Sequence, residues 1–197
     1  MLGYSGGAPY ALAAAAVLAD RVELVGLVSA WGPPDRPGAY DEVAVGERTS
    51  DALARHAPVL TKAMFGALAM SLRVAPTTMA RVLLSRLEAG GDESSAPRPG
   101  RESMAPLREA FRRGPGGPAR DLHLIVSPWG FDPVEVAAPV RLWHGDRDPE
   151  IPMHHSAYLA DAVGDGHLEV IAGGDHLALY HHADAIFAEL LAARPEG

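Results

Sequence analysis

Residues 1–30 read MLGYSGGAPYALAAAAVLADRVELVGLVSA, and this stretch decides the fold class. Alanine and leucine, which are strong helix formers, fill residues 8–18 and predict a helix there. Residues 22–30 are apolar and rich in β-branched side chains, which predicts a strand buried on both faces, as in a parallel sheet. A helix followed by a buried strand is half of a β-α-β unit, so the sequence predicts an α/β fold.

Ahead of that helix, residues 3–7 (GYSGG) fit the pattern G-x-S-x-G. This pattern can form a nucleophile elbow, a sharp strand-to-helix turn that presents a serine hydroxyl, here that of Ser5. We expect both Gly3 and Gly7 to be required, because a Cβ atom on either side of the strained turn would clash. The backbone N–H of Gly6 would point at a developing oxyanion. The structural alternative is a glycine-rich helix start with Ser5 as its N-cap.

The same alternation returns towards the C-terminus. Residues 140–144 (VRLWH) predict a buried strand, residues 167–171 (HLEVI) predict another strand, and residues 153–163 and 180–193 predict helices. We therefore expect one domain over residues 1–197, with an α/β core formed by residues 1–32 and 121–197 and a helical cap formed by residues 33–120.

Within the cap, residues 40–113 read as helical, with a flexible connection at 90–100 and a short helix at 102–111. Residues 114–118 predict a break. Apolar residues at three- and four-residue steps predict one continuous stripe, which could also line an apolar pocket. The stripe consists of Leu53, Ala57, Leu60, Met64, Leu68 and Leu72, and a following helix continues it with Met79, Val82, Leu83 and Leu87.

Two polar motifs follow predicted strands. Residues 144–152 (HGDRDPEIP) place a carboxylate just past a strand end, where α/β proteins put their sites and where it could orient a histidine. Asp148 is favoured for this role, and Asp146 is the alternative. The glycines of residues 173–176 (GGDH) allow a loop that aims His176 back across the sheet edge, whereas the adjacent Asp175 should diverge from it. Each motif could also be an ordinary turn, but Ser5, Asp148 and His176 occur in the order that a serine triad requires.

Together these residues resemble the α/β-hydrolase superfamily, in its esterase, peptidase and haloperoxidase-like branch. The resemblance is carried by LGYSGGAPYALAAAA (2–16), SPWGFD (127–132), LWHGDRDPEIP (142–152) and IAGGDHLAL (171–179). It implies Ser5 as nucleophile, His176 as base, Asp148 as the acid and the Gly6 N–H as an oxyanion donor. Tyr4, beside the nucleophile, would line the substrate pocket, and no diffusible cofactor is implied.

The resemblance also implies several strands before the elbow, whereas residues 1–197 begin at it. We therefore expect a chain that is truncated at its N-terminus relative to the family, with exposed apolar surface and an unpaired strand edge. In the family, the loop that supplies a second oxyanion N–H lies upstream of the elbow.

The amino-acid composition limits the classes of molecule that the protein is expected to bind. The net charge of −8 argues against general affinity for nucleic acid or anionic membranes, and the absence of cysteine excludes disulfides and thiol chemistry. Residues 9–19 could pass for the apolar part of a signal peptide, but no Lys or Arg precedes them, so we expect a cytoplasmic protein. No H-E-x-x-H pattern occurs, and adjacent histidines such as His154 and His155 should diverge on a helix, so we expect no metal site.

The sequence thus predicts a serine hydrolase that cleaves a small ester or amide through an acyl-enzyme. By the resemblance, a serine at the elbow argues against haloalkane dehalogenase or epoxide hydrolase chemistry, which uses a carboxylate nucleophile. One alternative is a catalytically incomplete remnant that acts as an interaction module. Another is a perhydrolase or lyase that uses the same triad. The oligomeric state is left open.

Overall fold

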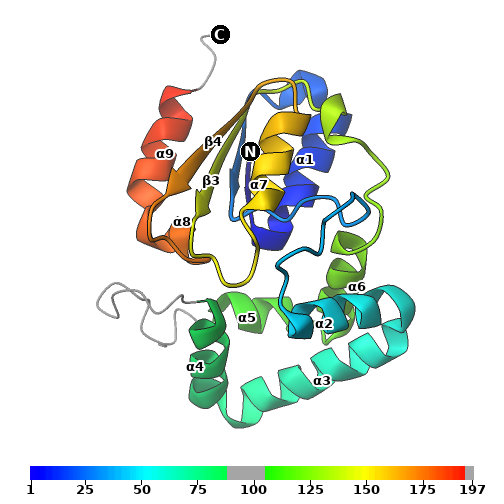
Figure 1. The fold of residues 1–197 in the computed structure, drawn as a ribbon. Coiled ribbons are helices and arrows are strands. Elements are labelled where there is room, and N and C mark those ends of the chain that lie inside the picture. The colour runs from blue at the N-terminus through cyan, green and yellow to red at the C-terminus, as the bar shows by residue number, and fades with distance from the viewer. Residues whose placement is uncertain (88–104, 194–197) are drawn as a thin grey trace.

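The computed structural model describes residues 1–87 and 105–193, and the predicted connection at 90–100 lies outside them (Figure 1). Four parallel strands form one sheet in the order β1-β2-β3-β4. The strands are β1 (Leu2–Tyr4), β2 (Val25–Val28), β3 (Val140–Gly145) and β4 (Gly166–Ile171). The helices are α1 (Ala8–Val17), α2 (Val45–His56), α3 (Pro58–Val74), α4 (Pro76–Leu87), α5 (Ala105–Ala110), α6 (Gly116–Ile125), α7 (His154–Ala162), α8 (Ala178–His181) and α9 (Ala183–Ala192). The predicted α/β fold with a parallel sheet is confirmed.

Helices cover both faces of the sheet, with α1 and α7 on one face and α8 and α9 on the other (Figure 1). Side chains alternate between the faces along β2: Leu27 packs into the core under α1 and α7, whereas Val28 packs with Ile186 of α9. Both valines and the leucine of this strand are fully buried. Burial on both faces explains why the sequence of β2 is apolar throughout rather than alternating.

Strand β2 is shorter than the predicted 22–30. Residues Ala19–Arg21 form a 3-10 turn before it, and Ser29 adopts a left-handed conformation (φ 47°) after it. A residue with positive φ cannot continue the pleated ladder, so the strand ends at Val28 although the apolar run continues. The apolar run thus indicates which residues are buried, whereas the backbone conformation determines where β2 begins and ends.

The predicted single apolar stripe through the cap is wrong. Ala57 is extended (φ −139°) and separates α2 from α3, because Pro58 disfavours a helical residue before it. Leu60 and Met64, which follow the break, have 59% and 39% of their surface exposed. Leu72, two turns further on, is buried against Phe111 instead.

Helix α6 was not predicted, because its first residues, GGP, were interpreted as a break. Gly114 does form a turn with φ 91°, but the helix begins two residues later and Pro118 lies in its first turn, where proline is tolerated. At the other end of the chain, the predicted helix 180–193 consists of two helices, α8 and α9, which are separated at His182.

The helical layer α2 to α6 lies across the carboxyl ends of the strands (Figure 1). Within it, α6 packs on both α2 and α3, and Arg55 of α2 donates to the carbonyl oxygen of Val126 directly after α6. This layer therefore lies over the edge of the sheet where the predicted site residues are found. No helix among residues 1–87 and 105–193 is long and apolar enough to cross a bilayer.

Strand β1 forms the edge of the sheet and, within the described ranges, pairs only with β2. An apolar groove runs beside it, lined by residues that include Leu2, Leu24, Phe187 and Leu190. The expected unpaired edge and exposed apolar surface are therefore present.

Candidate active site

Ser5 lies on a strained turn between β1 and α1. Its φ is 53°, a left-handed value that is uncommon for a residue other than glycine. Such strain is found where a tight turn must present a functional side chain. A Cβ on Gly3 would lie 2.9 Å from the Cα atom of Ala8 and from the carbonyl oxygen of Gly7, so a glycine is required there.

The same expectation for Gly7 is wrong. A Cβ at Gly7 would meet nothing within 4 Å, and the residue has ordinary helical dihedrals (φ −78°, ψ −16°). The turn is tight on the strand side of Ser5, where the helix start folds back on Gly3. On the helix side the chain has already entered regular geometry, so no close approach demands a glycine.

His176 reaches Ser5 from the loop after β4. Its Nε2 atom lies 3.0 Å from the Ser5 Oγ, at hydrogen-bonding distance. Glycines let the loops approach one another: a Cβ on Gly145, at the end of β3, would lie 2.3 Å from the backbone of Gly174. This close approach of two strand ends brings the histidine loop against the loop that carries Asp148.

Asp148 completes the constellation. Its Oδ2 atom lies 2.8 Å from Nδ1 of His176, and its Oδ1 atom accepts the backbone N–H groups of Glu150 and Ile151 at 2.9 Å each. Burial opposes ionisation of this side chain, but hydrogen bonds from His144, His176 and the backbone outweigh it and hold the pKa of Asp148 well below its usual range. The carboxylate is therefore charged and fixed.

Neither neighbouring aspartate takes this place. Asp146 is exposed, and its Oδ1 atom accepts the backbone N–H of Gly173 at 2.6 Å, which ties the two loops together. Asp175 turns to its own backbone and accepts the N–H of Leu177. The structure thus brings together Ser5, Asp148 and His176, the favoured set of the sequence analysis.

Sequence reasoning missed the part that His144 takes in this site. The side chain is fully buried, its Nε2 atom lies 2.9 Å from the carbonyl oxygen of Ile151 and 3.4 Å from the Asp148 carboxylate, and its Nδ1 atom lies 2.7 Å from the Ser156 hydroxyl. Because a carbonyl can only accept, Nε2 of His144 carries a proton, and the Ser156 hydroxyl lies where it can donate to Nδ1. A histidine inside a predicted buried strand was the available signal, since such a group needs partners.

Tyr4 and Gly6 flank Ser5 in the chain, but only Gly6 is among the described residues that line the cavity beside Ser5. The Tyr4 hydroxyl donates to the carbonyl oxygen of His176 at 2.8 Å, and its ring lies 5.4 Å from the imidazole. Tyr4 is not among the described residues that line the cavity at Ser5, so it supports the histidine loop rather than contacting that space. Gly6 does line the cavity, at the start of the helical segment.

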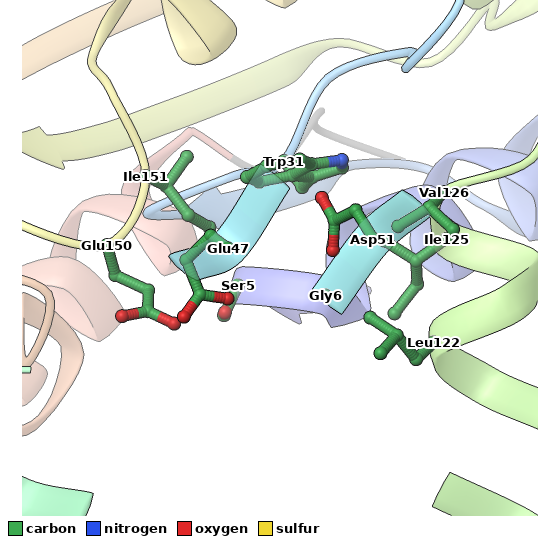
Figure 2. Close-up of a pocket in the computed structure, with 10 residues that line it drawn as sticks. All are labelled: Ser5, Gly6, Trp31, Glu47, Asp51, Leu122, Ile125, Val126, Glu150 and Ile151. Carbon is green, nitrogen blue, oxygen red and sulfur yellow. The ribbon is translucent and has the colours of Figure 1, made fainter. Parts of the chain in front are cut away.

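A cavity of about 180 Å³ opens beside Ser5 and Gly6 (Figure 2). Apolar side chains form much of its wall, namely Trp31, Leu122, Ile125, Val126 and Ile151. None of the residues of the predicted Met and Leu stripe is among the described residues that line it.

Three carboxylates that sequence reasoning missed also line the cavity: Glu47 and Asp51 from α2 and Glu150 from the loop after β3. The pKa of Asp51 is raised to about 7, first by burial and then by the charge of Glu47, whereas Arg55 opposes the shift. Burial also raises the pKa of Glu150, and Glu47 adds to that shift.

Histidines elsewhere do not assemble a metal site among the described residues, where no group of three or more His, Cys, Asp or Glu side chains could hold an ion. The expectation that His154 and His155 diverge is wrong: their rings stack with centroids 4.5 Å apart, and Trp31 stacks on His155 at the same distance. His155 accepts the N–H of Gly32, and burial lowers its pKa to about 3. These contacts are structural ones, in the wall behind the cavity.

No protein-family model matches the chain, and no curated protein matches it. Solved structures do. The 2-hydroxy-6-oxo-6-phenylhexa-2,4-dienoate hydrolase from Rhodococcus sp. strain RHA1 is 20% identical with a TM-score of 0.59, and the match covers 97% of this chain and 62% of that one. A bromoperoxidase from Bacillus anthracis is 20% identical with a TM-score of 0.58, over 96% of this chain and 65% of that one. A thermophilic esterase from Thermogutta terrifontis is 18% identical with a TM-score of 0.58, over 97% of this chain and 62% of that one.

These neighbours establish the fold that the sequence resemblance implied. An α/β-hydrolase fold protein from Nakamurella multipartita matches 98% of the chain in the same way, at 20% identity and a TM-score of 0.54. The chain spans 62% to 66% of the length of these four structures.

Proposed function

From the α/β-hydrolase fold of this chain and the contacts of Ser5, we propose that the protein is a serine hydrolase that cleaves an ester or amide through an acyl-enzyme. The observation that carries the proposal is the unbroken series Ser5 Oγ to His176 Nε2 at 3.0 Å and His176 Nδ1 to Asp148 Oδ2 at 2.8 Å. This is the geometry in which an imidazole can take the serine proton while a carboxylate holds its orientation.

In the proposed reaction, the Ser5 hydroxyl oxygen attacks the substrate carbonyl carbon and passes its proton to His176 Nε2. The backbone N–H of Gly6 donates to the oxyanion that forms. Collapse of this intermediate breaks the bond to the leaving alcohol or amine, which takes the proton from His176. A water molecule then attacks the acyl-enzyme with His176 as base, and the acid leaves as Ser5 regains its proton.

Asp148 takes part as a carboxylate, without taking up a proton. Its two backbone donors and two histidine contacts favour the ionised form, so it can stabilise the imidazolium throughout the cycle. His144 positions Asp148, because its Nε2–H lies between the Ile151 carbonyl and the carboxylate. Tyr4 positions His176 through the backbone carbonyl.

Covalent labelling with a fluorophosphonate probe tests the proposal. Wild-type protein should be labelled, and the variants Ser5→Ala and His176→Ala should not be. Asp161→Asn, on the outer surface of α7, is the control for handling and folding. If a folded wild-type protein stays unlabelled, or if Ser5→Ala is labelled equally, the proposal fails and the interaction-module alternative takes its place.

A further inference from the structure

The cavity beside Ser5 combines an aromatic side chain, Trp31, with carboxylates that form no ion pair within the described part of the chain. We propose that it holds a cationic group of the substrate, so that the enzyme acts on esters or amides carrying an organic ammonium group. This proposal rests on the proposed function, because it names the substrate class of the same site.

The carboxylates come from two parts of the chain and face one space. Glu47 and Asp51 are four residues apart on α2 and so lie on the same face of that helix. Glu150 enters from the loop that carries Asp148. Figure 2 shows the Glu47 and Glu150 side chains directed towards one another beside Ser5, and Glu47 raises the electrostatic cost of ionising Glu150.

Asp51 is the most informative of the three, because only 5% of its surface is exposed and it lines the cavity. Buried carboxylates are normally paired with a cation. Within residues 1–87 and 105–193, no ion pair includes Asp51, Glu47 or Glu150. Tyr40 forms a hydrogen bond with the Asp51 carboxyl group but brings no positive charge, so a cationic ligand would favour the ionised form of Asp51 and complete the site.

The nearby basic groups do not balance this charge. The guanidinium group of Arg55 donates to the carbonyl oxygen of Val126, and it opposes the pKa shift of Asp51 only in part. Arg86 of α4 acts weakly on Glu150. His176 is already paired with Asp148. Three carboxylates therefore line the cavity, whereas neither Arg55 nor Arg86 is among the described residues that line it.

Trp31 gives an independent indication of a cation. Its side chain is 7% exposed and lines the same cavity, and His155 stacks at 4.5 Å on one side of the indole. Tryptophan is the aromatic residue that attracts a cation best, and quaternary ammonium groups are commonly recognised by such rings. The three carboxylates do not form a metal-ligand set among the described residues, so an alkylammonium group fits the site better than a metal ion.

The test uses three methyl esters matched in shape: that of trimethylammoniobutyric acid, its isostere with a tert-butyl group in place of trimethylammonium, and the half ester of glutaric acid. Binding to Ser5→Ala is measured by calorimetry, which does not depend on turnover. The cationic ester should bind at least about tenfold more tightly than the neutral isostere, and the anionic ester most weakly.

Variants connect that preference to the carboxylates. In the Ser5→Ala background, Glu47→Gln with Glu150→Gln should reduce the preference to within about threefold. Asp161→Asn changes the net charge by one unit away from the cavity and should leave the preference intact. Circular dichroism checks that each variant is folded.

Different experimental outcomes would overturn the cationic site and the serine hydrolase activity. Equal binding of the cationic and neutral esters, no binding of either, or a preference for the anionic ester would overturn the cationic site even if fluorophosphonate labels Ser5. An unlabelled wild type whose Ser5→Ala variant still prefers the cationic ester would overturn the hydrolase and leave the cation site standing.

Discussion

His176 and Asp148 are 28 residues apart in the chain, yet Nδ1 of the histidine lies 2.8 Å from Oδ2 of the aspartate. Asp175, the immediate neighbour of His176, bonds to the N–H of Leu177 and takes no part in this contact. Parallel neighbouring strands explain the difference. The loops after β3 and β4 leave the sheet side by side, whereas adjacent residues in one loop point apart.

This contact predicts that substitutions of two aspartates in the same loop will have very different effects on kcat. Asp148→Asn should lower kcat by roughly 10⁴-fold, because the new amide N–H would face His176 Nδ1 and favour the wrong tautomer. Asp146→Asn should change kcat by less than about threefold, since its Oδ1 can still accept the Gly173 N–H. Hydrolysis of p-nitrophenyl acetate measures both, and similar losses in the two variants would contradict the assignment.

A second prediction concerns stability at His144. Ser156→Ala removes the partner of a fully buried ring nitrogen and should lower the free energy of unfolding by about 1–3 kcal/mol. Ser85→Ala, which removes an exposed hydroxyl from α4, is the control and should change it by less than about 0.5 kcal/mol. Urea unfolding followed by circular dichroism gives both values. Equal effects would show that the His144 to Ser156 contact contributes little.

Asp51 predicts an unusual dependence of stability on pH. Its folded-state pKa, about 7, is above that of an unfolded aspartate, so folding takes up a proton at intermediate pH. Its contribution to stability therefore falls as pH rises from about 4 to 7 and stays low above that. Asp51→Asn should gain stability relative to wild type as pH rises through this window.

Thermal unfolding of both proteins at pH 5 and pH 8 measures the effect. The Tm of Asp51→Asn minus the Tm of wild type should be more positive at pH 8 than at pH 5. Asp161→Asn supplies the control, and a difference that is the same at both pH values for Asp51→Asn would show that the carboxyl group is already ionised at pH 5.

The elbow predicts opposite outcomes for two glycines that occupy equivalent places in the G-x-S-x-G pattern. Gly3→Ala should cost about 1–3 kcal/mol and weaken labelling of Ser5, because its methyl group would press on Ala8 and Gly7. Gly7→Ala should be neutral or should stabilise by up to about 1 kcal/mol, since there is space and the backbone is helical. Labelling and denaturant unfolding distinguish them, and loss of labelling in Gly7→Ala would contradict this account.

Much of the architecture could be predicted because its signals are local. Apolar runs marked β2 and β3 as strands with helices on both faces, and polar motifs at strand ends marked Ser5, Asp148 and His176. Breaks caused by proline and glycine were harder to interpret. Pro58 ended a helix that the apolar stripe had seemed to continue, and Pro118 lies in the first turn of α6, which had been read as a break.

The sequence by itself determined the α/β alternation, the burial of β2 and β3 and the order of the three site residues, because each follows from the spacing of neighbouring side chains. Only the tertiary structure decided that His144 braces Asp148, that Tyr4 supports His176 and that Glu47 and Asp51 lie beside Ser5. Those contacts join residues from distant parts of the chain, and nothing in the sequence of α2 indicates which part of the sheet this helix will cover. Which charges meet is set by how the helical layer packs on the sheet, a property of three-dimensional packing that no local periodicity encodes.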